Sequence, residues 1–428
     1  MLSIKEFLLT EYKISHETFL LGEAVEKKLK DAFEQIEKIK EFNFYKVLSA
    51  MKKIGLSDRH FNWTTGYGYS DLGREKIDEL YAEIFRTEDA IVRSSFANGT
   101  HVLGLCLKSL LHQGEGLLSV TGKPYDTLDE IIGLKGNYQS SLIKRGIDYK
   151  EVPFSKEGTL NFEEIEKTLQ ENPQIKMVYI QRSTGYTYRK ALTIENIKLV
   201  VSLVKSIKPD VICMVDNCYG EFLETKEPSE VGVDVLAGSL IKNPGGGIAL
   251  SGGYIAGNAV LIKQIAQEYT LPGIERECGL TFGQSRSLFQ GLFLAPNIVS
   301  QAIKSAVFCG ALFQEAGYKV KPEPFEKRSD IIQSILLGSK EKVLAFCEAI
   351  QAVAPVDAYA KPEPWDMPGY SHKIIMAAGT FIQGSSIELS ADAPIKEPYI
   401  VYFQGGLDYA HGKIGALKAL ESLNNLES

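Results

Sequence analysis

The stretch SLIKNPGGGIALSGG, residues 239–253, is the most informative part of this chain. It holds too many glycines for a helix, and its apolar flanks are untypical of a linker. The strand-like run DVLAGSL (residues 234–240) ends just before the only lysine of the stretch, Lys242. Desolvation at a buried strand end lowers the pKa of a lysine, which leaves a neutral amine able to attack carbonyl carbons. The alternative is an ordinary solvated loop lysine.

Short apolar strands and amphipathic helices alternate around this stretch. The sequence predicts strands over residues 89–96, 116–122, 177–183, 211–217 and 234–240, and helices over residues 99–111, 125–134 and 193–207. This alternation is typical of an α/β fold with a mainly parallel sheet and helices on both faces. Ligands of such sheets gather at the carboxyl ends of the strands, where Lys242 is expected.

The chain is too long for one ordinary core, since it has 428 residues. Residues 1–60 are predicted to form a helical segment, because AVEKKLKDAFEQIEKIKEF (residues 24–42) repeats apolar side chains every three or four residues. We predict a large domain over residues 61–300. A smaller α+β domain is predicted over residues 301–428, where strands, helices and proline-rich segments mix.

The composition argues against several classes of function. The net charge of −7 offers no electrostatic footprint for nucleic acid, and no apolar run approaches the ~20 residues that span a bilayer. The first residues lack the pattern of a secretory signal, and the six cysteines form no C-x-x-C pair. The six histidines are dispersed, without the spacing of metal ligands. We therefore expect a cytoplasmic protein with reduced thiols that binds neither membranes nor nucleic acids.

A turn of small residues, SFANGTH (residues 95–101), leads from a predicted strand into a predicted helix. The exposed N–H groups and the positive end of the helix dipole suit a phosphate, to which Thr100 adds a hydroxyl. Taken alone, the stretch favours a simpler role, in which Asn98 caps the helix and Gly99 eases the turn.

Two further side chains lie at predicted strand ends. Tyr125, in VTGKPYDTLDE (residues 120–130), can lie flat on a planar ligand or pack over its own loop. This stretch is not a phosphate-binding P-loop, because Gly116 comes one residue too early and Pro124 replaces the required Ser or Thr. Asp216 closes an apolar run, where a carboxylate needs a partner. The alternatives for Asp216 are a functional contact, a helix cap or an ion pair.

Each of these signals is weak alone, but their order along the chain is informative. A phosphate turn, an aromatic residue, an aspartate at a strand end and the pair Ser239-x-x-Lys242 follow one another. A dinucleotide-binding protein is disfavoured, because the chain contains no G-x-G-x-x-G.

This ordered set resembles the fold-type-I pyridoxal-phosphate (PLP) enzymes. More narrowly, the chain is similar to the methionine γ-lyase-like family, also labelled "aluminum resistance protein", which is related to cystathionine γ-synthase and β-lyase. The phrases that carry the resemblance are GYGYSDLGRE, SFANGTH, VTGKPYDTLDE, VDNCYGEF, GSLIKNPGGGIALSGGYIAG, QGLFLAPN and GSSIELSADAPIKEPYIVYFQGGL. They extend from about residue 60 to residue 411, and VDNCYGEF followed by SLIKNPGGG is the specific part. The resemblance implies a sheet of seven strands.

The resemblance also implies a role for each matched residue. It gives Lys242 the Schiff base with PLP, Asp216 the pairing with the pyridinium nitrogen, and Tyr125 the stacking over the ring. The positions that hold the phosphate are matched by Gly99, Thr100 and Ser239.

In the wider family, a tyrosine from the neighbouring subunit also reaches this phosphate. Tyr69 is the closest match, with Arg74 as its companion. The active site then needs a homodimer, and a homotetramer of two dimers is the habit of the family.

The activity that the resemblance implies is that of a carbon–sulfur lyase. Asp216 keeps the ring nitrogen protonated, so that the ring accepts the electrons left when the Cα–H bond of the substrate breaks. Lys242, released when the substrate amine replaces it, takes that proton. Elimination of a β- or γ-sulfur group from a cystathionine-, cysteine- or methionine-type substrate yields an α-keto acid and ammonia.

Two segments depart from the family pattern. Trans-sulfuration enzymes hold the substrate carboxylate with an Arg in a segment like R-L-S-V-G, whereas YIVYFQGGL (residues 399–407) has none. Lys396 is one substitute, although it lacks the bidentate fork of arginine. Arg182, in QRSTGY (residues 181–186), is the other candidate, and this segment also lacks an Asn expected near the ring oxygen. The alternatives are therefore a PLP-dependent aminotransferase or decarboxylase, or a PLP-binding protein without a catalytic role.

Overall fold

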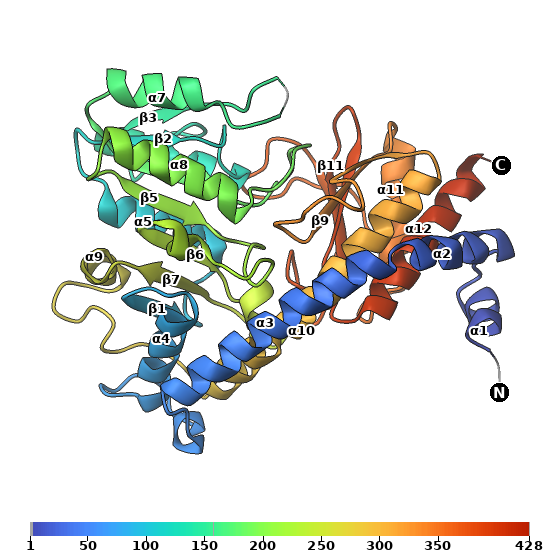
Figure 1. Cartoon of the computed structure of the whole chain (residues 1–428), viewed down its shortest axis with the longest axis horizontal. Helices are drawn as coiled ribbons and strands as arrows, with labels where there is room; N and C mark the ends of the chain where they lie inside the picture. Colours follow the sequence, from blue (N-terminus) through green and yellow to red (C-terminus); the bar gives the residue numbers. More distant parts are fainter. Residues whose placement is uncertain (1–2, 157, 428) are drawn as a thin grey trace. The chain divides into compact units, whose positions relative to one another are not determined.

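The computed structural model of the chain describes residues 3–156 and 158–427 (Figure 1). The described residues form two compact units. The large unit comprises Phe42–Gly185 and Ala191–Pro296. The small unit comprises the described residues up to Glu41, the segment Tyr186–Lys190 and the described residues from Asn297 onward. The sequence carried no signal that the N-terminal helices group with the C-terminal residues.

A seven-stranded, mainly parallel sheet is the centre of the large unit, as predicted. Its strands are β1 (Asp89–Arg93), β2 (Gly116–Ser119), β3 (Asp148–Glu151), β4 (Ile175–Gln181), β5 (Ile212–Asp216), β6 (Val235–Ser239) and β7 (Gly253–Gly257). They lie in the order β1-β7-β6-β5-β4-β2-β3, and β7 runs antiparallel to both of its neighbours. The central strands β5 and β6 are buried along their whole length, as expected for strands covered on both faces.

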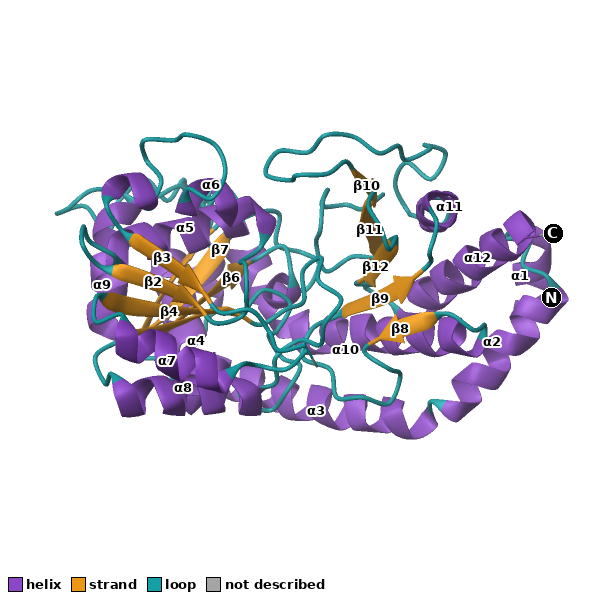
Figure 2. Cartoon of the chain, turned by 90° about the horizontal axis from the view of Figure 1, so that it is seen from above, coloured by secondary structure: helices purple, strands orange, loops and turns teal. Residues whose placement is uncertain are grey.

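Helices cover both faces of this sheet, and Figure 2 shows α5 and α6 on one side and α7 and α8 on the other. The α-helices of the large unit are α4 (Leu72–Ile84), α5 (Gly99–Leu110), α6 (Asp129–Ile132), α7 (Phe162–Glu171), α8 (Ile194–Ile207) and α9 (Ala259–Tyr269). Its 3₁₀ helices are η1 (Asp58–Phe61), η2 (Asp126–Leu128), η3 (Ile143–Arg145), η4 (Pro228–Val231) and η5 (Asn243–Gly245). The helix predicted over residues 125–134 thus forms as two short pieces. The predicted cap of α5 is present, since Asn98 Oδ1 accepts a hydrogen bond of 2.8 Å from the N–H of His101.

The small unit confirms the predicted α+β domain. Its antiparallel sheet has the order β10-β11-β12-β9-β8. These strands are β8 (Lys319–Lys321), β9 (Ile332–Leu336), β10 (Ile374–Ala377), β11 (Ser390–Pro394) and β12 (Ile400–Gln404). Its helices are α1 (Ile4–Glu11), α2 (His16–Lys28), α11 (Lys340–Gln351) and α12 (Tyr409–Glu427). Helices α2 and α12 approach closely, because a Cβ on Gly22 would lie 2.7 Å from Leu417 Cδ2.

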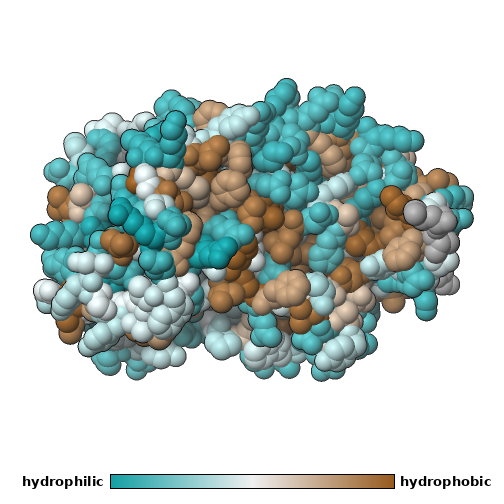
Figure 3. Space-filling view, turned by 90° about the horizontal axis from the view of Figure 1, so that it is seen from below, coloured by the Kyte–Doolittle hydropathy of each residue, from teal (hydrophilic) through white to brown (hydrophobic). Residues whose placement is uncertain are grey.

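Two long helices, α3 (Lys30–Lys53) and α10 (Ser285–Glu315), contain residues of both units. Helix α10 continues through Pro296, although proline removes one helical hydrogen bond. By length and composition α10 could also cross a membrane, which the sequence analysis did not foresee. Because 67% of its apolar window is buried inside the structure, the helix is explained as a core element. Apolar side chains also reach the surface in several places, as the face drawn in Figure 3 shows.

The glycines after Lys242 form a turn that leaves no room for side chains. Gly246 has a φ of 55°, in the left-handed region that favours glycine. A Cβ on Gly246 would lie 2.2 Å from the carbonyl oxygen of Gly291, in α10. A Cβ on Gly245 would lie 1.7 Å from the carbonyl oxygen of Leu240. This close packing fixes the turn that carries Lys242.

We expect the substitution Gly245→Ala to lower the free energy of unfolding by about 1–3 kcal/mol, because its Cβ overlaps the main chain. The control is Gly68→Ala, since nothing lies within 4 Å of that Cβ position, and its effect should stay within ~0.5 kcal/mol. Urea denaturation measures both values. Equal stability of the two variants would contradict the packing described for the turn.

Candidate active site

Asp216 is the last residue of β5, and its carboxylate is buried and hydrogen-bonded at both oxygens. The hydroxyl of Tyr179, on β4, donates to Oδ2 at 3.2 Å, and the N–H of Cys218 donates to Oδ1 at 3.1 Å. Only 4% of the residue is exposed. These donors hold a negative charge at the carboxyl end of the sheet, where the sequence predicted it.

Lys242 stands three residues beyond the end of β6 and is partly buried. Its Nζ lies 4.1 Å from the centroid of the Tyr219 ring. Burial opposes the positive charge, but the neighbouring Cys218, Tyr219 and Asp216 side chains raise the pKa of Lys242 above its usual value. The expectation of a lowered pKa was therefore wrong. In the chain alone, these surroundings favour the ammonium form.

The start of α5 lies beside the end of β6. A Cβ on Gly99 would lie 3.5 Å from Ser239 Cβ and 3.7 Å from Cys218 Sγ. The next residue, Thr100, shares a hydrogen bond of 2.6 Å with the hydroxyl of Thr127. The fold thus brings the N-terminal turn of α5, with its unpaired N–H groups, to the strand ends that carry Asp216 and Lys242.

Tyr125 lies against the segment that follows β4. A Cβ on Gly185 would lie 3.1 Å from Tyr125 Cδ2 and 3.2 Å from Gln181 Nε2. Gln181 pairs with Asp216 across the parallel strands β4 and β5. The predicted aromatic residue is therefore located next to the same edge of the sheet.

These residues fit the cofactor that the resemblance implies. PLP carries an aldehyde, a ring nitrogen and a phosphate on one flat ring. The structure provides an amine at Lys242, a buried carboxylate at Asp216 and an aromatic ring at Tyr125. The first turn of α5 at Gly99, beside Ser239, supplies the N–H groups and the positive helix end that bind phosphate.

Tyr69 stands just before α4, and Arg74 belongs to the first turn of that helix. Arg74 is 1% exposed, and its guanidinium donates to the carbonyl oxygens of Gly66 at 2.6 Å and Glu277 at 2.5 Å. These contacts favour a supporting role for Arg74, which holds its own loop, over the predicted direct role at a phosphate. Tyr69 stands on that loop and is 74% exposed.

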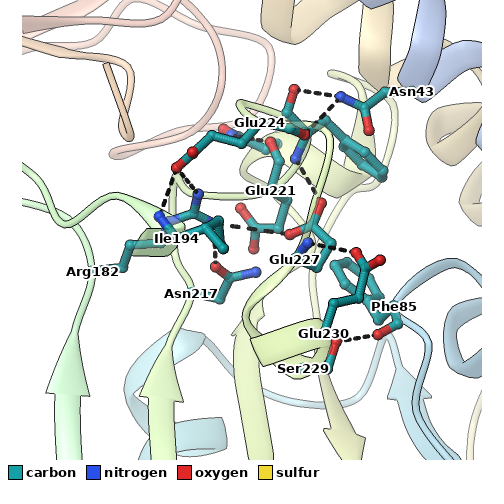
Figure 4. A network of polar contacts seen from close by, with 12 residues as sticks. Asn43, Phe85, Arg182, Ile194, Asn217, Glu221, Glu224, Glu227, Ser229 and Glu230 are labelled. Atoms are coloured by element: carbon teal, nitrogen blue, oxygen red, sulfur yellow. Dashed lines mark hydrogen bonds and ion pairs between the residues drawn. The ribbon is translucent and has the colours of Figure 1, made fainter. Parts of the chain in front are cut away.

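Arg182 belongs to a buried ionic network (Figure 4). Its Nη1 donates to Asn217 Oδ1 at 2.9 Å, and its Nη2 donates to Glu224 Oε1 at 3.3 Å. A second carboxylate, that of Glu227, lies 3.8 Å from Nη1. This geometry favours a structural role for Arg182 over the substrate-binding role predicted from its strand-end position. The sequence alone did not reveal that the acidic residues after β5 fold back over it.

Lys396, the other predicted carboxylate ligand, is exposed in the turn between β11 and β12 of the small unit. Three side chains that contact the predicted residues or lie in their network were not predicted from the sequence: Tyr179, Tyr219 and Glu221. Tyr219 and Glu221 follow Asp216 in the quoted VDNCYGEF, so proximity along the chain was the available signal. Tyr179 is two residues before the end of its strand, which gave no comparable signal.

Comparison with known proteins identifies relatives with similar architecture. The family model described as methionine gamma-lyase matches residues 19–424. The uncharacterized protein YnbB of Bacillus subtilis (strain 168) is 45% identical over 400 residues, which is 93% of this chain and 94% of that protein. The crystal structure of a carbon–sulfur lyase involved in aluminum resistance from Clostridium novyi NT is 50% identical, with a TM-score of 0.95 over 99% of this chain and 100% of that one. The pyridoxal-5'-phosphate-dependent protein YhfS from Escherichia coli shares the fold at 16% identity, with a TM-score of 0.61 over 91% and 97% of the two chains. These likenesses confirm the predicted fold-type-I architecture.

We expect Arg182→Met to lower the free energy of unfolding by about 3–5 kcal/mol, because it leaves the buried Glu224 without its cation and removes one of the two cations beside Glu227. The control is Arg86→Met, whose exposed pair with Glu83 should contribute at most about 1 kcal/mol. Chemical denaturation measures both. A stable Arg182 variant that only loses affinity for an amino-acid substrate would restore the role predicted from the sequence.

Proposed function

Because the chain belongs to the methionine gamma-lyase family, we propose that it is a PLP-dependent carbon–sulfur lyase acting on a sulfur amino acid. The observation that carries the proposal is the placement of Asp216 at the end of β5 and of Lys242 just beyond the end of β6, two neighbouring parallel strands. The likeness to the carbon–sulfur lyase of Clostridium novyi supports the same class of reaction.

The large unit would hold the cofactor with residues from four elements. Asp216 would face the ring nitrogen and keep its proton, since a nearby carboxylate stabilises a cation. Tyr125 would lie on the ring. The phosphate would be bound by Gly99, Thr100 and Ser239. When bound, PLP supplies an electron sink for the pair left by the broken Cα–H bond.

Lys242 would have two tasks. Its Nζ would hold the cofactor covalently until the substrate amine replaces it. The released Nζ would then act as the base that takes the proton from Cα. The sulfur group leaves from Cβ or Cγ, and hydrolysis gives an α-keto acid and ammonia. Cystathionine-, cysteine- and methionine-type substrates all meet this description.

We further propose that the active protein is a homodimer or a homotetramer of two such dimers. Tyr69 would reach the phosphate of the neighbouring subunit, and its exposure within one chain supports this role. Other aromatic side chains near it are also exposed: Trp63 at 70%, Tyr67 at 77% and Phe282 at 55%. The loops that carry them pair through main-chain hydrogen bonds, for example from Thr281 N–H to the carbonyl oxygen of Thr65 at 2.9 Å. Such a grouping is typical of a surface that is covered in an oligomer.

The cytoplasm is the proposed location. All six cysteines of the chain are described and free. Free and mostly buried thiols are typical of proteins kept in a reducing compartment.

The proposal predicts keto-acid release by the PLP-loaded protein. In a screen of cystathionine, cysteine, methionine and homocysteine, at least one should yield α-keto acid and ammonia in equal amounts. Lys242→Ala should lower this turnover by at least about a thousandfold, since it removes the base and the covalent anchor. Borohydride reduction followed by mass spectrometry should locate the cofactor on residue 242.

Other products would identify other functions. Transfer of the amino group to an added keto acid, without free ammonia, would indicate an aminotransferase. Release of carbon dioxide would indicate a decarboxylase. Bound PLP without exchange of the Cα proton in any sulfur amino acid would indicate a binding protein without catalysis, and a protein that does not take up PLP would contradict the proposal.

Shared active sites predict complementation between two inactive variants. Tyr69→Ala should weaken the phosphate site of the partner, and Lys242→Ala should inactivate its own site. Unfolding and refolding an equal mixture should restore activity at about one quarter of the sites, because half of the dimers are mixed and each has one intact site. Sedimentation confirms the dimers. Activity that stays at the level of the separate variants would mean that Tyr69 acts within its own chain or not at the site.

A further inference from the structure

Glu221 is a fully buried carboxyl group that the proposed reaction does not use. It follows Asp216 by five residues and belongs to the turn after β5. A Cβ on Gly238 would lie 2.6 Å from Glu221 Oε1, so the carboxyl lies against β6 directly before Ser239. Its position is therefore next to the strand end that leads to Lys242.

A chain of hydrogen bonds connects this carboxyl group to the buried network around Arg182. The hydroxyl of Tyr254, on β7, donates to Glu221 Oε1 at 2.7 Å. The same hydroxyl accepts from Asn217 Nδ2 at 3.2 Å, and Asn217 Oδ1 accepts from Arg182. Glu221 Oε2 has no hydrogen-bond partner among the residues that the structure describes. One oxygen is thus held firmly, while the other is buried without a donor.

Two contacts relate Glu221 to Lys242. Asn243 Nδ2 donates to the main-chain oxygen of Glu221 at 3.0 Å, which ties the Lys242 turn to the Glu221 turn. The Glu221 carboxylate is also among the groups that raise the pKa of Lys242. The first contact uses the main chain of Glu221, and the second uses the charge of its side chain. Replacing the carboxyl group with a neutral group therefore removes the second contact and keeps the first.

The surroundings of Glu221 allow its carboxyl group to gain or lose a proton near neutral pH. Burial raises the pKa of its carboxyl to about 8, and the Glu227 carboxylate adds to this. The hydrogen bond from Tyr254 and the charge of Arg182 act in the opposite direction. The other titratable groups that interact with it are Tyr81 of α4, Cys218 and Lys242.

We propose that Glu221 is a positioning residue for Lys242. The carboxyl group of Glu221 holds a proton within the network, and the charge of this group sets how strongly Lys242 is retained as an ammonium ion. This inference rests on the proposed function for its biological meaning. Proton loss from Glu221 would stabilise the ammonium, and proton gain would release it. The fraction of Lys242 present as a neutral amine, which must attack the cofactor and later take the Cα proton, would therefore depend on Glu221.

The test measures the reactivity of Lys242 in the cofactor-free full-length chain. Acetic anhydride reacts with neutral amines, and mass spectrometry gives the acylation rate at residue 242 between pH 6 and pH 10. Glu221→Gln keeps an oxygen that accepts from Tyr254 but cannot ionise. We expect the variant and the parent protein to react equally at pH 6 and to differ at least threefold above pH 9, with the variant more reactive.

Glu224→Gln is the matched control, because Glu224 also contacts Arg182 but is not among the groups found to act on Lys242. The acylation rate of Lys242 in the Glu224→Gln variant should equal that in the parent protein at every pH. Tyr254→Phe provides a second variant, because loss of its hydrogen bond raises the pKa of Glu221 further. The acylation rate of Tyr254→Phe at residue 242 should therefore fall below that of Glu221→Gln only at a higher pH than the rate of the parent protein does. Equal rates for parent protein and Glu221→Gln across the whole range, or the same divergence in Glu224→Gln, would overturn the proposal.

Thermal unfolding checks that Glu221 titrates in the folded protein. A carboxyl whose folded pKa lies above its unfolded value destabilises the fold increasingly as pH rises from about 4.5 to about 8. The melting temperature of Glu221→Gln minus that of the parent protein should therefore grow over this interval and then level off. A constant difference would contradict the proposal. The lyase proposal fails separately, through absence of keto-acid release by the loaded protein.

Discussion

The burial of opposite charges at the ends of β5 and β6 is the constraint on which the site depends. A carboxylate removed from water is costly unless donors and a cation are close. Asp216 receives hydrogen bonds from Tyr179 and from the N–H of Cys218, and it contributes to the raised pKa of Lys242. The strands keep the two side chains at one edge of the sheet, because β5 and β6 run parallel and Asp216 pairs with Ala237, two residues before the end of β6. A group that binds here meets an amine and a carboxylate that are already positioned.

The turn after β5 extends this charge balance into the core of the large unit. Glu224 accepts from Arg182 and from the N–H of Ile194, at 2.9 Å for the latter. Glu227 lies 3.5 Å from the buried Nζ of Lys46 and accepts from the N–H of Phe222. These acids are matched by cations from distant parts of the chain, which makes the turn rigid. Glu221 and Glu227 each keep one buried oxygen without a hydrogen-bond donor among the described residues.

Glycines allow the polar groups to approach the main chain closely. A Cβ on Gly220 would lie 2.5 Å from Arg182 Cδ, so this glycine makes room for the guanidinium. Gly238 does the same for Glu221, and Gly245 allows the Lys242 turn to fold on Leu240. The composition of VDNCYGEF and SLIKNPGGG therefore reflects packing as well as chemistry.

The sequence by itself determined the fold class and the order of the chemical groups. Strands and helices were recognisable because their apolar periods are local, and Asp216 and Lys242 followed from their places at strand ends. Helix 125–134 was predicted less well, since its actual form, η2 and α6, depends on a turn at Gly133 with a φ of 102°.

Tertiary structure alone decided which groups surround each charge. The raised pKa of Lys242, the burial of Arg182 by Glu224 and the hydrogen bond from Arg74 to Glu277 all arise between segments that are separated in sequence. Electrostatic energy depends on distance and burial, and neither can be read from spacing along the chain.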